Sequence, residues 1–204
     1  MKELISRYPQ LSDCAEKITK AVDFIVNGYK NKGKVLVCGN GGSAADSEHI
    51  VGELMKGFMS KRPLTEEERE SLKNAGDESM ADFLQRGIPA ISLPSQIGVL
   101  SAFVNDVKPE NIYAQLMFAY GTPNDTAICI STSGNSANIV NAAVAAKAKG
   151  VKVVALVGGK ECKLDKIADV CIHVPETETY KVQELHLPVY HYICAEVERQ
   201  LFGE

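Results

Sequence analysis

Five short apolar runs, rich in β-branched residues, alternate along this chain with segments of helical periodicity. Near-continuous apolar strands are typical of a parallel sheet whose two faces are both covered by helices. Right-handed crossovers then produce a doubly wound fold, in which ligands bind at the carboxyl ends of the strands. We therefore predict an α/β three-layer sandwich with a five-stranded parallel sheet. Its predicted strands lie within residues 35–38, 88–93, 126–131, 151–157 and 169–174.

Long amphipathic segments flank this pattern at both ends of the chain. An apolar stripe predicts one N-terminal helix over about residues 2–31, and a second helix runs from about residue 181 to 202. Pro188 is expected to kink the second helix or to loosen one of its turns. Two long terminal helices outside the sheet favour a bundle shared between subunits. We treat residues 1–204 as a single domain.

Segment 60–86 is rich in charged side chains and poor in large apolar ones, which predicts a surface insertion. Thr65 followed by Glu68 resembles a capping box that opens a surface helix. The segment is interpreted as a lid, as part of a subunit interface or as surface decoration. Lys56, Lys61 or Arg62, close to its start, could bind a phosphate.

Charge and composition exclude several classes of partner. A formal net charge of −4 argues against a broad nucleic-acid or anionic-membrane surface, because both need clustered positive charge. Neither a signal peptide nor an apolar run of about 20 residues is present, so we predict a cytoplasmic protein without a membrane partner. The six cysteines are far apart in the sequence, without a CxxC pair, and are predicted to be free thiols rather than disulfides or a zinc-thiolate site.

A glycine-rich stretch, residues 39–46, follows the first predicted strand and opens a predicted helix. Glycines allow close approach of an anion, and a helix N-terminus adds unpaired N–H donors, so the stretch predicts a phosphate site. His49 and Glu53 are four residues apart, on one face of that helix, where they could bind a metal or move a proton. The alternative is an ordinary Gly-Gly-Ser turn.

A second loop, residues 131–136, follows the third predicted strand and precedes another helix. Its four hydroxyl side chains and its backbone amides suit phosphate oxygens. The alternative is that Ser136 only caps the helix within a polar loop. On the last helix, Gln183 and His191 are eight residues apart and return to nearly the same face, whereas His186 lies on the flank.

Taken together, these segments resemble the SIS-domain family, and within it the phosphoheptose isomerases. The resemblance spans almost the whole chain and implies a flavodoxin-like sandwich that assembles as a homotetramer with active sites at subunit interfaces. The motifs that carry it are Gly39-Asn40-Gly41-Gly42-Ser43, Asp46, His49 with Glu53, Asn105-Asp106, residues 130–136, Ala168-Asp169-Val170, and Gln183 with His186 and His191.

The resemblance also implies residue roles. Glu53 and His191 match the acid–base pair, and His49, Glu53, Gln183 and His191 match positions that hold zinc in some members, which implies one zinc per subunit and no nucleotide cofactor. The residues implied to contact the sugar phosphate are Asn40, Gly41, Gly42, Ser43, Gln96, Asn105, Asp106, Ser131, Thr132, Ser133, Ser136 and Gln183.

The implied reaction is the aldose–ketose isomerisation of sedoheptulose 7-phosphate to D-glycero-D-manno-heptose 7-phosphate through an enediolate. Gln96 departs from the family, because the members compared usually carry an aspartate that contacts the sugar at this place. A neutral amide there leaves the heptose configuration open. The alternatives are a non-catalytic tetrameric scaffold of the replication-initiator-associating type, and an isomerase or sensor for another phosphosugar.

Overall fold

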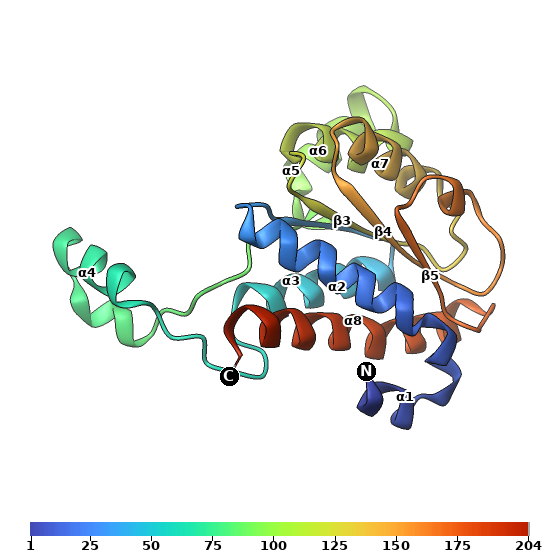
Figure 1. Ribbon diagram of the computed structural model, residues 1–204. Helices are drawn as coiled ribbons and strands as arrows, with labels where there is room; N and C mark the ends of the chain where they lie inside the picture. Colours follow the sequence, from blue (N-terminus) through green and yellow to red (C-terminus); the bar gives the residue numbers. More distant parts are fainter. Residues whose placement is uncertain (204) are drawn as a thin grey trace.

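A parallel sheet of five strands lies at the centre of the computed structural model, which describes residues 1–203 (Figure 1). The strand order is β2-β1-β3-β4-β5, and all neighbouring strands are parallel. Each strand lies inside the apolar run predicted for it, so the predicted α/β class and sheet are confirmed. The strands are β1 (Val35–Cys38), β2 (Ala90–Ser92), β3 (Thr126–Ile130), β4 (Lys152–Val157) and β5 (Val170–His173).

Helices cover both faces of the sheet, which completes the predicted three layers (Figure 1). Alternate side chains of each strand enter one of two cores: Val35 and Val37 join α2, α3 and α8, whereas Leu36 and Cys38 join α6 and α7. The helices are α1 (Lys2–Arg7), α2 (Ala15–Lys30), α3 (Gly42–Met55), α4 (Glu66–Ala75), α5 (Ile97–Asp106), α6 (Ile112–Tyr120), α7 (Ala137–Ala148) and α8 (Thr179–Phe202). The 3₁₀ turns are η1 (Pro9–Cys14), η2 (Glu78–Asp82), η3 (Leu93–Ser95), η4 (Pro109–Asn111) and η5 (Lys163–Lys166).

The predicted single helix over residues 2–31 is wrong, because the chain there forms α1, η1 and α2 in succession. Tyr8 has a non-helical backbone, with φ −133° and ψ 71°. Its successor, Pro9, disfavours the helical region for the preceding residue and has no N–H to donate. In contrast, Pro188 lies inside α8 without ending it.

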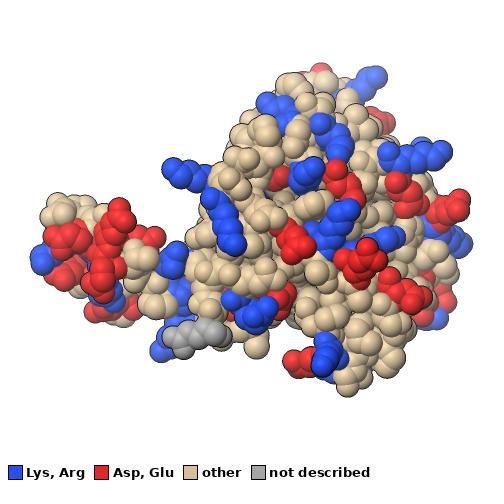
Figure 2. All heavy atoms as spheres, viewed as in Figure 1, with Lys and Arg blue, Asp and Glu red and all other residues tan. Residues whose placement is uncertain are grey.

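The charged insertion projects from the body as an arm that carries α4 and η2 (Figure 1). Its predicted capping box is confirmed: Thr65 Oγ1 accepts from the Glu68 backbone N at 3.2 Å, and Glu68 Oε2 accepts from the Thr65 backbone N at 2.8 Å. Acidic side chains crowd the face of the arm seen in Figure 2. The function of the arm stays a prediction.

The cysteines are free thiols, as predicted, and all except Cys162 are buried. Cys38 and Cys129 face each other from neighbouring strands, with 3.8 Å between their sulfur atoms. Within residues 1–203, no helix combines the length and the apolar character needed to cross a membrane.

Candidate active site

The two predicted phosphate loops leave the sheet side by side. Strands β1 and β3 are neighbours in register, with Cys38 opposite Cys129, and residues 39–43 and 131–136 follow these two strands. The strand order reverses direction between β1 and β3, and this reversal is where doubly wound sheets bind ligands. The fold therefore places both loops at the same edge of the sheet, and that they bind one ligand stays a prediction.

The first loop turns sharply into α3. Gly41 has φ +55° and ψ −120°, a conformation that disfavours residues with a side chain, and it precedes the first residue of α3. The first N–H groups of a helix have no partner inside the helix and attract anions. Behind the loop, the Tyr113 hydroxyl donates to the Gly39 carbonyl at 3.0 Å, and burial raises the pKa of Tyr113 to about 12. Tyr113 thus fixes the loop from the side of the core.

Hydroxyl groups of the second loop point toward one another rather than into the helix that follows. The hydroxyls of Ser131 and Ser136 are 3.1 Å apart. Ser136 occupies the N-cap position of α7, but its side chain makes no capping hydrogen bond. Its interpretation as a side-chain cap is therefore wrong. The Asn135 backbone N donates to Ser133 Oγ at 3.2 Å, so this loop keeps a compact turn of polar groups.

A reciprocal pair of amide hydrogen bonds joins the two loops. Asn40 Nδ2 donates to Asn138 Oδ1 at 2.9 Å, and Asn138 Nδ2 donates to Asn40 Oδ1 at 2.8 Å. Asn138 lies in the first turn of α7, directly after the second loop. Sequence reasoning missed Asn138, because a pairing across 98 residues leaves no local pattern. The pair fixes the separation of the two loops.

Next to the first loop, three side chains from α3 and α8 converge. His49 Nε2 lies 3.2 Å from Glu53 Oε1 and 3.3 Å from His191 Nε2. The Tyr190 hydroxyl contacts His49 Nδ1 at 3.1 Å and donates to Asp46 Oδ1 at 3.2 Å. Because the single Tyr190 proton goes to the carboxylate, His49 Nδ1 must carry the other proton. His49 Nε2 donates to Glu53 when the imidazole is protonated, and otherwise its lone pair is open to a proton or a cation.

Burial shifts the pKa values of the groups around this cluster. It lowers the pKa of His191, helped by the neighbouring His49, and raises the pKa of Asp46 and of Tyr190. His191 is therefore a neutral imidazole at pH 7. Glu53 Oε2 is buried without a hydrogen-bond partner among residues 1–203. Its nearest cation is Lys56, whose Nζ lies 3.8 Å away. A carboxylate oxygen without a hydrogen bond, beside two imidazoles, is suited to a proton transfer or to a cation.

Gln183 is the fourth residue predicted to hold a metal. Its amide lies against the first loop, so close that a Cβ on Gly42 would be 2.5 Å from Gln183 Nε2. Imidazole, carboxylate and amide oxygen are acceptable zinc ligands, and the buried Glu53 oxygen without a hydrogen bond, beside two imidazoles, suits a cation. The donor types of these four residues therefore fit a metal, and that they hold one stays a prediction.

A second cluster of metal-ligating side chains lies elsewhere. The ligand atoms of Cys162, Asp165, Cys171 and His173 are all within 4.8 Å of one another, a spacing that no other group of histidine, cysteine and acidic residues reaches in the described part of the chain. The sequence predicts free thiols rather than a zinc-thiolate site and so does not anticipate this cluster. The missed signal is the pair of spacings Cys-x-x-Asp and Cys-x-His.

Comparisons with known proteins agree with this geometry. The model of the SIS domain matches residues 2–87 and 79–158. A phosphoheptose isomerase from Aneurinibacillus thermoaerophilus is 36% identical over 203 residues, covering 99% of this chain and 89% of the relative. Phosphoheptose isomerase 2 of Campylobacter jejuni is 38% identical over 180 residues, covering 88% of this chain and 78% of the relative. This chain belongs to the SIS-domain phosphoheptose isomerase family. The solved structure of phosphoheptose isomerase GmhA from Neisseria gonorrhoeae matches with a TM-score of 0.76 at 27% identity. The match covers 97% of this chain and 94% of that structure's chain.

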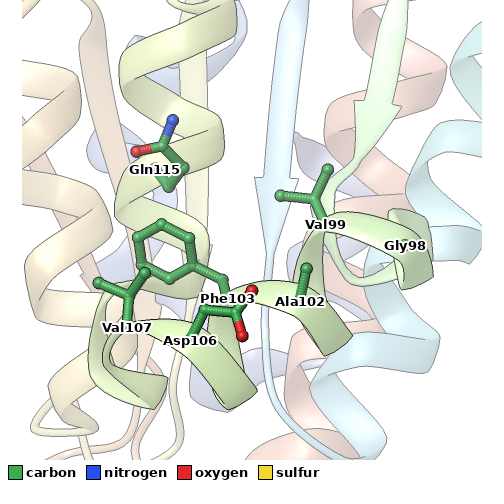
Figure 3. A pocket seen from close by; sticks show the side chains of 7 residues that line it. All are labelled: Gly98, Val99, Ala102, Phe103, Asp106, Val107 and Gln115. Carbon is green, nitrogen blue, oxygen red and sulfur yellow. The ribbon is translucent and has the colours of Figure 1, made fainter.

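In this member of the phosphoheptose isomerase family, three of the predicted sugar contacts, Gln96, Asn105 and Asp106, are not hydrogen-bonded to the two loops among the residues that the structure describes. Gln96 Oε1 accepts from the Tyr120 hydroxyl at 3.3 Å, and Asn105 Nδ2 donates to Asp106 Oδ1 at 2.7 Å. No hydrogen bond within residues 1–203 joins them to either loop. Asp106 instead lines a hollow between α5 and α6, beside Phe103 (Figure 3). Their role in sugar binding stays a prediction.

His186, predicted on the flank of the last helix, is fully buried, and neither ring nitrogen has a partner in the described chain. Burial lowers the pKa of His186 from 6.5 to about 4. Between these values the unfolded chain binds a proton that the folded chain does not, so the free energy of unfolding falls as pH falls from 6.5 to 4. We expect a loss of about 3 kcal/mol from this residue.

The variant His186→Leu is expected to remove this part of the pH dependence. Urea unfolding of the wild type and the variant at several pH values between 7 and 4 gives the two slopes. The difference between the two slopes isolates the contribution of His186, because the carboxylates and His191 titrate in both proteins. Equal slopes would mean that His186 is protonated in the folded state.

Proposed function

We propose that this protein is an aldose–ketose isomerase that converts sedoheptulose 7-phosphate to D-glycero-D-manno-heptose 7-phosphate. The observation that carries the proposal is the convergence of Glu53, His49 and His191 beside two phosphate-suited loops that Asn40 and Asn138 hold together. The family relationship supports the same reaction class and favours an enzyme over a scaffold.

Isomerisation requires removal of a proton next to a carbonyl and proton transfer to the oxygens of the enediolate. We assign Glu53 as the base, because its carboxylate has a buried oxygen without a hydrogen-bond partner. His191 is the partner acid, and its lowered pKa means that, once protonated, it gives up the proton readily to the substrate oxygens. The two groups exchange roles when the reaction reverses.

His49, Glu53, Gln183 and His191 would hold one zinc ion. When bound, zinc supplies Lewis-acid polarisation of the substrate oxygens. A carboxylate bound to zinc is a weaker base than a free one, so strong ligation by Glu53 competes with its role as the base. The contact between His49 Nδ1 and the Tyr190 hydroxyl favours the tautomer with the proton on Nδ1. Ligation of a metal would then use His49 Nε2.

The test of the proposed reaction is an assay of the purified full chain with sedoheptulose 7-phosphate beside shorter ketose phosphates. We expect conversion of the seven-carbon substrate to the aldose, with a lower kcat/KM for the others. Isomerisation of a shorter sugar phosphate alone would assign another substrate, in agreement with Gln96 as a changed sugar contact. Binding without turnover of any sugar phosphate would indicate a sensor or a scaffold.

Replacing Ser133 by alanine is expected to raise KM for the sugar phosphate while kcat changes little. A lost hydrogen bond to a charged phosphate is worth about 1.5–3 kcal/mol, or about tenfold to a hundredfold in KM. Ser71→Ala on the exposed face of α4 is the matched control, because its hydroxyl bonds only to the Glu67 carbonyl. An unchanged KM in the Ser133→Ala variant would mean that this hydroxyl does not bind phosphate.

The homotetramer with active sites between subunits also stays a proposal, as does the cytoplasmic location. Exposed apolar side chains on α5, at its C-cap and on α6 support an interface there: Ile97, Val104, Val107 and Phe118 are each about half exposed or more. Asn105 and Asp106 lie on the same part of the surface. A neighbouring subunit could then complete a site that one chain leaves open.

A further inference from the structure

The cluster formed by Cys162, Asp165, Cys171 and His173 comes from two adjacent segments. Cys162 and Asp165 belong to the turn around η5, and Cys171 and His173 belong to β5. Residues two apart on a strand point to the same side, so the thiol of Cys171 and the imidazole of His173 face the turn together. Neither segment contributes to the proposed acid–base cluster.

Hydrogen bonds orient the two ionisable groups of this cluster toward its centre. His173 Nδ1 lies 2.9 Å from the Gly158 carbonyl oxygen, which only accepts, so this nitrogen carries a proton. His173 Nε2 and Asp165 Oδ1 lie 2.6 Å apart and form an ion pair when the imidazole is protonated. Metal binding would displace this proton and take both atoms as ligands. The other carboxylate oxygen accepts from the Cys162 backbone N at 2.7 Å. This is the supporting arrangement found behind metal ligands.

We propose that Cys162, Asp165, Cys171 and His173 together bind one Zn²⁺ ion in a four-coordinate structural site. Tetrahedral zinc with sulfur, nitrogen and oxygen ligands places the ligand atoms ~3.3–3.8 Å apart, and the four atoms here lie within 4.8 Å without an ion. Two thiolates select zinc over magnesium or calcium. Four protein ligands leave no open position, so the ion has a structural role.

The site lies directly behind the second phosphate loop. Gly134 approaches Cys162 so closely that a Cβ at residue 134 would overlap the Cys162 sulfur atom. The Lys163 backbone N donates to Asn135 Oδ1 at 3.0 Å. Gly158, which accepts from His173, also donates its N–H to the Thr132 carbonyl at 3.0 Å. Three contacts therefore connect the metal cluster with residues 131–136.

These contacts give the site a consequence for the enzyme. A bound ion cross-links η5 to β5 and thereby fixes the wall against which the second loop packs. We expect metal at this site to raise the unfolding temperature and, on the basis of the proposed function, to lower KM for the sugar phosphate with little change in kcat. The ion would act on the position of the loop and make no contact with the substrate.

Cobalt binding to the full chain tests the site independently of catalysis. The chelator-stripped, reduced protein is titrated with Co²⁺, and the thiolate-to-cobalt charge-transfer band in the near ultraviolet is recorded. The other candidate metal set contains no thiol, so this band reports on the cysteine cluster alone. We expect the band to saturate at one Co²⁺ per chain and to disappear when Zn²⁺ is added.

Variants make the assignment specific. Cys162→Ala is expected to abolish the band and to weaken metal binding by more than about a hundredfold, and Asp165→Asn, at an exposed position, to weaken binding with the fold intact. Cys129→Ala, in β3, is the matched control and should keep the band. His49→Ala should lose turnover and keep the band, which separates this proposal from the proposed function.

Three outcomes would overturn the site. One is the absence of a thiolate band at saturating Co²⁺, and another is a band that is unchanged in Cys162→Ala. The third is a Cys162–Cys171 disulfide that forms in preference to metal binding after reduction and chelator removal. Loss of isomerase activity by itself bears only on the proposed function.

Discussion

The Glu53→Gln variant is expected to lower kcat for sugar-phosphate isomerisation by about 10²–10⁴-fold, the contribution typical of a positioned general base. Glutamine keeps the size of the side chain and can still hydrogen-bond to His49, but it cannot take a proton from carbon. The phosphate loops are untouched by the change. Sugar-phosphate binding, measured by calorimetry, should therefore stay close to that of the wild type.

The matched control is Glu48→Gln on the same helix, where the carboxylate accepts from the Ser92 hydroxyl at 3.1 Å. This variant should keep most of the wild-type kcat. His191→Gln provides a second test, because loss of the partner acid should also lower kcat. Wild-type turnover in Glu53→Gln would remove Glu53 from the mechanism, and a loss confined to binding would make it a ligand for the substrate or for a metal only.

The sequence predicts the sheet well because each strand is a local signal. Both faces of a central parallel strand are buried, so β3 after Thr126 and β4 after Lys152 are apolar without interruption and each run stands out by itself. The same logic places the two loops at one edge, since each follows a strand directly. The prediction of a single N-terminal helix fails for an equally local reason. The apolar stripe continues past Pro9, but the backbone of Tyr8 is not helical.

The parts of the site that sequence reasoning missed are contacts between distant segments. Asn40 with Asn138 and Asp46 with Tyr190 are pairs of ordinary polar residues, separated by 98 and 144 positions. Nothing in their own neighbourhoods marks them as partners. Arg62 is the clearest case: its position beside the first loop suggests a phosphate contact, yet its side chain is fully buried against Glu198.

The buried pair of Arg62 and Glu198 fixes the chain where α3 ends and the arm begins. Glu198 accepts from Arg62 Nε at 2.6 Å and from the backbone N–H groups of Phe58, Met59 and Ser60. The Arg62 guanidinium also donates to the carbonyls of Glu53 and Leu54, at 3.1 Å and 2.6 Å. These carbonyls belong to the last turn of α3, where a cation is favourable.

Removing one partner of this pair is therefore expected to be costly. Glu198→Ala leaves a buried guanidinium and three N–H groups without their acceptor, and we expect a loss of about 3–5 kcal/mol in the free energy of unfolding. The control is Glu178→Ala at the N-cap of the same helix, which removes an exposed pair with Lys181 and should cost less than about 1 kcal/mol. Urea unfolding at one fixed protein concentration measures both, because association of subunits would otherwise change the apparent stability. A loss in Glu198→Ala no larger than that of the control would mean that water enters this end of α3 and replaces the carboxylate.

Since Arg62 also bonds to the backbone of Glu53, any Glu198→Ala protein that still folds should show a reduced kcat, whereas the control should not.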